Sequence, residues 1–125
     1  MAYSTLIWLR ESYFKDKPQA KKALENRVKP LFRNHKIEIE KGKDAKEVGE
    51  ESIIEFIRRV RNALGHANVS VTENSFIFED INPRIQEDYV KITMSWHALG
   101  ELTKMVIAAG NDILYSKKKH NKSLH

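Results

Sequence analysis

The chain has 125 residues, of which 41% are hydrophobic and 31% charged, with a formal net charge of +5 and no cysteine. This composition predicts one globular domain with a single core, and it excludes disulfide bonds, zinc–thiolate sites and thiol nucleophiles. The positive charge favours anionic partners, nucleic acid above all, although part of it comes from Lys117, Lys118, Lys119 and Lys122 near the end of the chain.

No apolar stretch approaches the roughly 20 residues that a membrane-spanning helix needs, so we predict no membrane partner. Residues 1–14 lack a basic segment and a small-residue cleavage site, which favours a first helix over a signal peptide. Together with the absence of cysteine, these features predict a cytoplasmic protein.

Two helices are predicted before residue 34. Apolar residues at three- and four-residue steps indicate a helix over residues 2–15. A second helix starts near Pro18, because the missing N–H of proline needs no partner in a first helical turn. Pro30 lies inside the same apolar pattern and must kink or restart this helix.

Residues 34–50 give a weaker signal. Ile37 and Ile39 alternate with glutamates at the period of a strand, but over too few residues to define one. The charged segment at residues 43–48 lies between two glycines. We predict that this region is a surface connection.

Residues 51–68 form the clearest amphipathic helix in the sequence. At about 100° per residue, its apolar side chains fall on one side, and they are Ile53, Phe56, Ile57, Val60, Ala63, Leu64 and Ala67. The opposite side carries Arg58, Arg59, Asn62 and His66, with Arg61 at the edge between the two. The pattern predicts a helix that packs on the core and displays these polar residues.

After this helix the apolar period changes from 3.6 to 2. Alternating segments at residues 69–72, 76–79 and 89–94 predict a small antiparallel hairpin or three-stranded meander, which must pack on helices to be stable. Ser95 then caps a last helix, whose predicted buried residues are Trp96, Leu99, Leu102, Val106, Ala109 and Ile113.

These elements predict a mainly α fold. We expect an antiparallel helical bundle over residues 1–116, with a β insertion at about residues 69–94 before the last helix. Residues 117–125 are predicted to form a basic, flexible tail.

The candidate site is the segment RNALGH at residues 61–66. Polar residues on a helix surface are most often simply solvated, and an anion site for a structural partner also fits the spacing. Within a straight helix Arg61 and His66 would diverge by roughly 140°, whereas Asn62 lies beside His66 and could orient its imidazole. A second copy of the helix across a two-fold axis would bring two Arg and two His residues around one cleft.

This segment resembles the R-x4–6-H motif of HEPN domains. Arg61 matches the Arg, Asn62 the polar residue that commonly follows it, and His66 the His. The order of elements around the motif is similar to that of small HEPN proteins with a β insertion. The resemblance implies an α-helical bundle that dimerises through its motif helices. Many such domains are metal-independent endoribonucleases, often toxins or phage-defence effectors, while others bind nucleotides or are catalytically silent.

The chemistry that the resemblance implies suits these residues. An imidazole titrates near neutral pH, so His66 can take the proton of a ribose 2′-OH, and Arg61 can stabilise charge on the attacked phosphate. Arg58 or Arg59 would grip RNA phosphates. No cofactor is needed, and the nearby carboxylates, Glu50, Glu51 and Glu55, form no evident metal-ligand set.

Two hypotheses follow. The first is a homodimeric HEPN ribonuclease, in which Arg61 and His66 are catalytic, Asn62 supports them, and RNA and a cognate antitoxin or regulator are the partners. The second is a non-catalytic helical module that uses the same surface to bind a protein or nucleotide. Cleavage of RNA that is lost with His66 separates the two.

Overall fold

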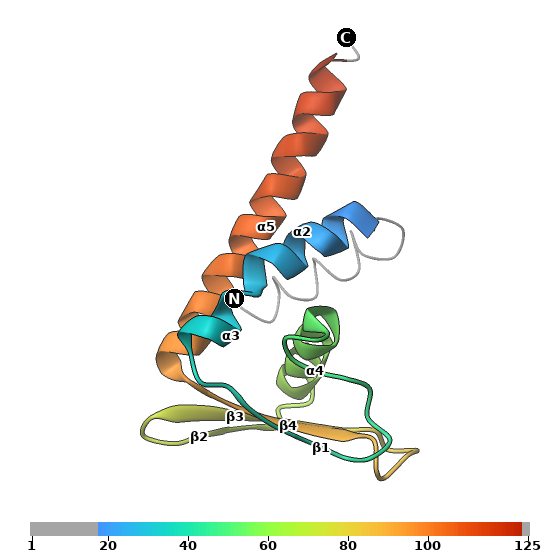
Figure 1. The fold of residues 1–125 in the computed structure, drawn as a ribbon, viewed down its shortest axis with the longest axis vertical. Coiled ribbons are helices and arrows are strands. Elements are labelled where there is room, and N and C mark those ends of the chain that lie inside the picture. The colour runs from blue at the N-terminus through green and yellow to red at the C-terminus, as the bar shows by residue number, and fades with distance from the viewer. Residues whose placement is uncertain (1–17, 124–125) are drawn as a thin grey trace.

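The computed structural model describes residues 18–123 and arranges them as a sheet with helices on one of its faces (Figure 1). In chain order the elements are α2 (Pro18–Val28), α3 (Leu31–Asn34), β1 (Glu38–Lys41), α4 (Ile53–Gly65), β2 (Val69–Val71), β3 (Ser75–Ile81), β4 (Tyr89–Ser95) and α5 (Trp96–Ser123). The strands form one antiparallel sheet in the order β1-β4-β3-β2. In Figure 1 this sheet is seen from its edge, with α4 directly above it and α2 packed against α5.

The predicted mainly α bundle is therefore wrong. The β segments are not a small insertion but a four-stranded layer, and the helices cover one of its faces in an α+β arrangement. The missing strand is β1, in the region with the weak alternating signal, where Ile39 pairs with Ile92 of β4. An edge strand this short has too little periodicity of its own, and its partner lies far along the chain.

The connection after β1 returns close to the start of β4. Gly42 is buried, and its N–H donates to the carbonyl oxygen of Tyr89 at 2.9 Å. A Cβ at this position would lie 2.0 Å from the carbonyl oxygen of Glu87, so only glycine allows the two chain segments to approach this closely. This contact fixes the loop that precedes β4.

The second predicted helix is confirmed with its break at Pro30. Helix α2 ends at Val28, and α3 begins at Leu31 with Pro30 immediately before it. The first predicted helix, residues 2–15, lies outside the described residues. Helix α5 continues to Ser123 and so includes most of the predicted tail; the domain boundary at residue 116 stays a prediction.

The core lies between the sheet and the helices. Alternate residues of β3 and β4 point into it, and they are Phe78, Val90, Ile92 and Met94. Helix α4 contributes the buried residues Ile53, Phe56, Ile57, Val60 and Ala63, as its amphipathic pattern predicts. Within the described part of the chain, no helix combines the length and apolar character needed to cross a membrane.

The start of α5 confirms one prediction and corrects another. The Oγ of Ser95 accepts a hydrogen bond from the Ala98 N–H at 3.0 Å, which is the predicted helix cap. Trp96, predicted to be buried, is 52% exposed and instead places its ring 4.8 Å from that of Phe76, measured between centroids. The buried stripe passes through Ala98, Leu102, Val106 and Ala109 on a helix that packs mainly against α2.

Candidate functional site

The C-terminal end of α4 carries the motif and ends in a compact hydrogen-bonded turn. The helix ends at Gly65, three residues before the predicted limit at residue 68, and His66 is its C-cap. The N–H of Asn68 donates to the carbonyl oxygen of Ala63 at 2.8 Å, and that of Ala67 to Leu64 at 3.1 Å. This pair of bonds is a Schellman motif, which requires a left-handed residue after the cap. Ala67 supplies it with φ of 56°, an uncommon conformation for a residue other than glycine.

This ending sets where the motif leaves the helix. The N–H of His66 still donates to the carbonyl oxygen of Asn62 at 3.0 Å, as in a helix, but its φ of −94° and ψ of 6° turn the chain away after it, and its side chain is exposed. The divergence of roughly 140° expected between Arg61 and His66 stays a prediction. The helix holds Arg61 and Asn62, while the cap presents His66 to solvent.

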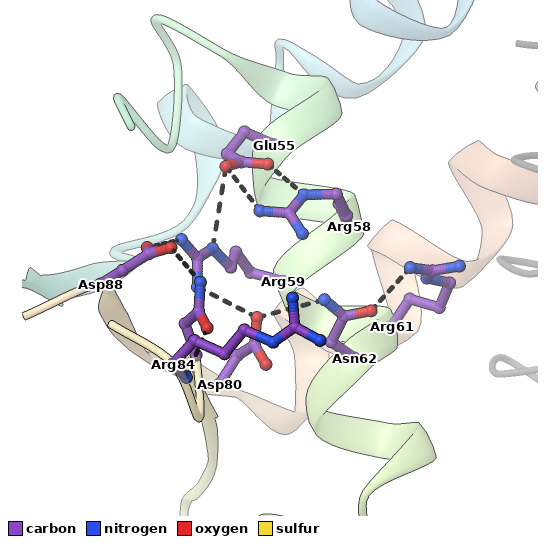
Figure 2. A network of polar contacts seen from close by, with 9 residues as sticks. Glu55, Arg58, Arg59, Arg61, Asn62, Asp80, Arg84 and Asp88 are labelled. Atoms are coloured by element: carbon purple, nitrogen blue, oxygen red, sulfur yellow. Dashed lines mark hydrogen bonds and ion pairs between the residues drawn. The ribbon is translucent and has the colours of Figure 1, made fainter. Parts of the chain in front are cut away.

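Asn62 forms two side-chain hydrogen bonds, neither of them to His66. Its Nδ2 donates to Asp80 Oδ2 at 3.2 Å, and its Oδ1 accepts from Arg61 Nη2 at 2.6 Å. Figure 2 shows Asn62 between these two residues. The predicted support of the imidazole by Asn62 is thus not what the structure shows, and Asn62 instead holds Arg61.

Arg59 is placed differently from the prediction. The sequence pattern displays it, but the structure buries it to 2% exposure, because β3 and the loop before β4 pack on that side of α4. Arg59 Nη1 lies 3.1 Å from Asp80 Oδ2, Nη2 donates to Asp88, and Nε lies 3.8 Å from Glu55 Oε2 (Figure 2). With its charge already matched by carboxylates, Arg59 joins the helix to the sheet and leaves the set of candidate RNA-binding residues.

Arg58 is also paired, but closer to the surface. Its side chain is 30% exposed and forms a two-pronged ion pair with Glu55, in which Nη2 donates to Oε2 at 2.9 Å and Nε to Oε1. The hydrogen bonds from Arg58 lower the pKa of the Glu55 carboxyl despite its burial, and they raise the pKa of Arg58 in turn. Any phosphate that binds Arg58 must share it with Glu55.

Arg61 differs from both neighbours in having no carboxylate partner among the described residues. Its described partner is the neutral amide of Asn62, and its buried Nε–H has no hydrogen-bond acceptor within the described chain. A guanidinium whose described partner is a neutral amide is suited to an anionic oxygen, because planar guanidinium groups bind phosphate through parallel N–H donors. Among the three arginines of α4, Arg61 is therefore the one whose charge no carboxylate of the described residues balances.

The acidic residues around Arg59 were not predicted from the sequence. A signal for one of them exists, since the alternation Phe76, Phe78, Asp80 places Asp80 on the inward face of its strand. A carboxylate in that position demands a buried cation. Asp88 has no comparable pattern, and its pKa is lowered by hydrogen bonds from Asn82 and Arg59. Over residues 18–123, no group of three or more His, Asp or Glu side chains is arranged to hold a metal ion.

Comparison with known proteins identifies the family of this chain. The family model described as HEPN pEK499 p136 matches residues 1–113. Neither the curated proteins nor the solved structures include a match to this chain. The family match covers most of the chain and confirms the predicted HEPN family. The chain therefore belongs to the HEPN pEK499 p136 family.

Proposed function

We propose that this HEPN-type domain is an endoribonuclease that cleaves RNA without a metal ion, at a composite site formed by two copies of the chain. The observation that carries the proposal is the contrast among the arginines of α4. Arg58 and Arg59 are neutralised by carboxylates, whereas Arg61 has no carboxylate partner within residues 18–123 and is held by Asn62 one turn before an exposed His66. These are the groups that cleavage of a phosphodiester by its own 2′-hydroxyl requires.

In the proposed reaction His66 acts as the general base. Its imidazole takes the proton of the ribose 2′-OH, and the 2′-oxygen forms a new bond to the adjacent phosphorus. The bond from phosphorus to the 5′-oxygen breaks, leaving a cyclic phosphate on one fragment and a 5′-hydroxyl on the other. Arg61 stabilises the negative charge that accumulates on the phosphate oxygens in the transition state.

A second copy of the chain completes the site. The leaving 5′-oxygen needs a proton, and an imidazole that has just acted as the base is on the other side of the phosphorus in an in-line displacement. Because α4 ends in an exposed cap, two such ends can meet across a two-fold axis, and His66 of the second copy can donate that proton. Arg58 would add a weaker phosphate contact, since it already pairs with Glu55.

The test uses end-labelled single-stranded RNA with the unmodified protein and with His66→Ala. We expect cleavage in the presence of EDTA, cyclic phosphate and 5′-hydroxyl ends, and a loss of about 10²- to 10⁴-fold in rate for His66→Ala. His97→Ala is the matched control, because His97 is an exposed histidine on α5 outside the motif. Equal cleavage by His66→Ala, or no cleavage by the unmodified protein, contradicts the proposal.

The same variants extend the test to cells. If the protein is a toxin or a defence effector, its expression slows growth and the His66→Ala variant does not. Stable binding of a protein or nucleotide without scission of RNA would instead identify a non-catalytic module.

A further inference from the structure

We propose that Asp80 is a positioning residue for Arg61, which it orients through the side-chain amide of Asn62. This inference rests on the proposed function for its catalytic consequence, but the contacts that carry it belong to the free protein. Asp80 lies on β3 and not in the motif, so the sheet, and not only the motif helix, sets the geometry of the candidate site.

The contacts form a continuous chain from the sheet to the motif. Asp80 is buried, and its Oδ2 lies 3.1 Å from Arg59 Nη1 and 3.2 Å from Asn62 Nδ2. Asn62 Oδ1 in turn lies 2.6 Å from Arg61 Nη2. Figure 2 shows Asp80, Asn62 and Arg61 in this order, with Arg59 on the other side of the Asp80 carboxylate.

The direction of these bonds follows from the chemistry of the three groups. A carboxylate accepts hydrogen bonds, a guanidinium only donates them, and an amide does one with each end. Asn62 must therefore turn its NH₂ group toward Asp80 and its oxygen toward Arg61. The reversed amide would place an oxygen against the carboxylate and an NH₂ group against the guanidinium, and both contacts would repel. Asp80 thus selects one of the two amide orientations, and that orientation holds Arg61.

Arg59 fixes the start of this chain. Its guanidinium is the buried counter-charge of Asp80, and Asp88 and Glu55 hold the same guanidinium from other directions. The carboxylate of Asp80 consequently cannot rotate away from Asn62 without losing its ion pair with Arg59. A rigid supporting contact of this kind keeps a catalytic group within the small tolerance that its chemistry allows.

Two matched substitutions separate positioning from general stabilisation. Asp80→Asn and Asp88→Asn each remove one carboxylate partner of Arg59, but only Asp80→Asn removes the acceptor that orients Asn62. We expect Asp80→Asn to lower kcat about 10- to 100-fold with a much smaller change in KM, because a misplaced catalytic group costs about that much. Asp88→Asn should keep kcat close to that of the unmodified protein.

A compensating pair provides the rescue. In the double variant Asp80→Asn, Asn62→Asp, the amide at position 80 can donate to the carboxylate at position 62, which can still accept from Arg61. We expect the double variant to hold the Arg61 guanidinium again, as measured by its side-chain N–H resonance, a coupling typical of residues in one hydrogen-bond network. We do not expect kcat to recover, because the carboxylate at position 62 neutralises Arg61. If Asp80 only balanced the charge of Arg59, the change at position 62 would restore nothing.

A spectroscopic measurement distinguishes failure of this inference from failure of the proposed function. The side-chain N–H resonance of Arg61, assigned by its loss in Arg61→Lys, reports whether the guanidinium is held in the protein without RNA. We expect this resonance to shift or broaden in Asp80→Asn and in Asn62→Ala, which leaves the pairs of Arg59 intact, and to be unchanged in Asp88→Asn. The Asn62→Ala spectrum carries the test if Asp80→Asn does not fold. An unchanged Arg61 resonance in Asp80→Asn overturns the positioning role. If Asp80→Asn does not fold, an unchanged resonance in Asn62→Ala overturns it. Neither result depends on whether the unmodified protein cleaves RNA.

Discussion

Two arginines two positions apart on α4 have opposite surroundings. Arg59 is 2% exposed and lies among Glu55, Asp80 and Asp88, whereas the one hydrogen-bond partner of Arg61 in the described part of the chain is a neutral amide. Both residues are arginines with helical backbone conformations, so neither the charge nor the local backbone distinguishes them. What distinguishes them is the sheet, because β3 and the loop before β4 bring carboxylates to Arg59 and none to Arg61.

The difference teaches which charges can take part in recognition. A guanidinium that is buried among carboxylates has already exchanged water for partners within the chain, and moving it toward a ligand would leave those carboxylates unpaired. A guanidinium held by an amide keeps its net charge and can offer it to a phosphate. Substitutions at the two positions should therefore separate stability from activity.

The largest expected effect is on folding. Replacing Arg59 with Met keeps much of the side-chain volume but leaves Asp80 and Asp88 without their buried cation, and we expect the free energy of unfolding to fall by about 3–5 kcal/mol. Urea denaturation followed by circular dichroism measures this change. The matched control is Arg61→Met, which breaks one hydrogen bond to Asn62 and should cost about 1 kcal/mol. Equal losses for the two variants would show that the contrast between the arginines has no energetic meaning.

A smaller effect concerns acid. The pKa values of Glu55 and Asp88 are lowered in the folded protein, from ordinary values of 4.5 and 3.8. A carboxyl whose pKa is lower in the folded state stabilises the fold above its unfolded pKa, and this contribution is lost as the pH falls through the folded pKa. We therefore expect stability to decline as the pH is lowered below about 4.5, with the contribution of Asp88 lost in the lower part of that range.

Asp88→Asn tests the acid effect directly. The variant should be less stable than the unmodified protein at neutral pH, and the difference between the two should shrink as the pH falls below 3.8. Denaturation curves at a series of pH values give both quantities. Asp44→Asn, at an exposed position in the loop after β1, serves as the control for loss of a surface carboxylate. A constant difference between Asp88→Asn and the unmodified protein at every pH would contradict the role assigned to the carboxylate.

Local patterns predicted several parts of this molecule correctly. The apolar stripe of α4, the break at Pro30, the strand alternation at residues 89–94 and the cap at Ser95 all depend on neighbours within a few residues, so the sequence shows them directly. The HEPN family could also be predicted, since the segment that resembles its motif, with Arg61, Asn62 and His66, is short and continuous; the roles of these residues stay predictions.

Features that depend on distant partners were not predicted. The strand β1 becomes clear only when Ile39 meets Ile92, and the burial of Arg59 follows from the position of the sheet beside α4. The periodicity of one helix shows which residues share a side, but it does not show which sides other elements will cover. The sequence therefore favoured a bundle where the structure has a sheet, and a displayed arginine where it has a buried one.

The smallest expected effect lies beside His66. Ala67 adopts φ of 56°, which glycine tolerates better than alanine, so Ala67→Gly should raise the free energy of unfolding by about 0.5–1 kcal/mol. Ala63→Gly is the matched control and should lower the free energy of unfolding by at least about 1 kcal/mol, because Ala63 is a buried residue in the interior of the helix.

Thermal unfolding and RNA cleavage should be measured together for Ala67→Gly. If the strained turn holds the cap rigid, Ala67→Gly will gain stability and lose activity, because a strained conformation next to a functional residue is kept for its geometry. A variant that gains both would show that the conformation of Ala67 does not position His66, and that Arg61 and its contacts alone set the geometry of this end of α4.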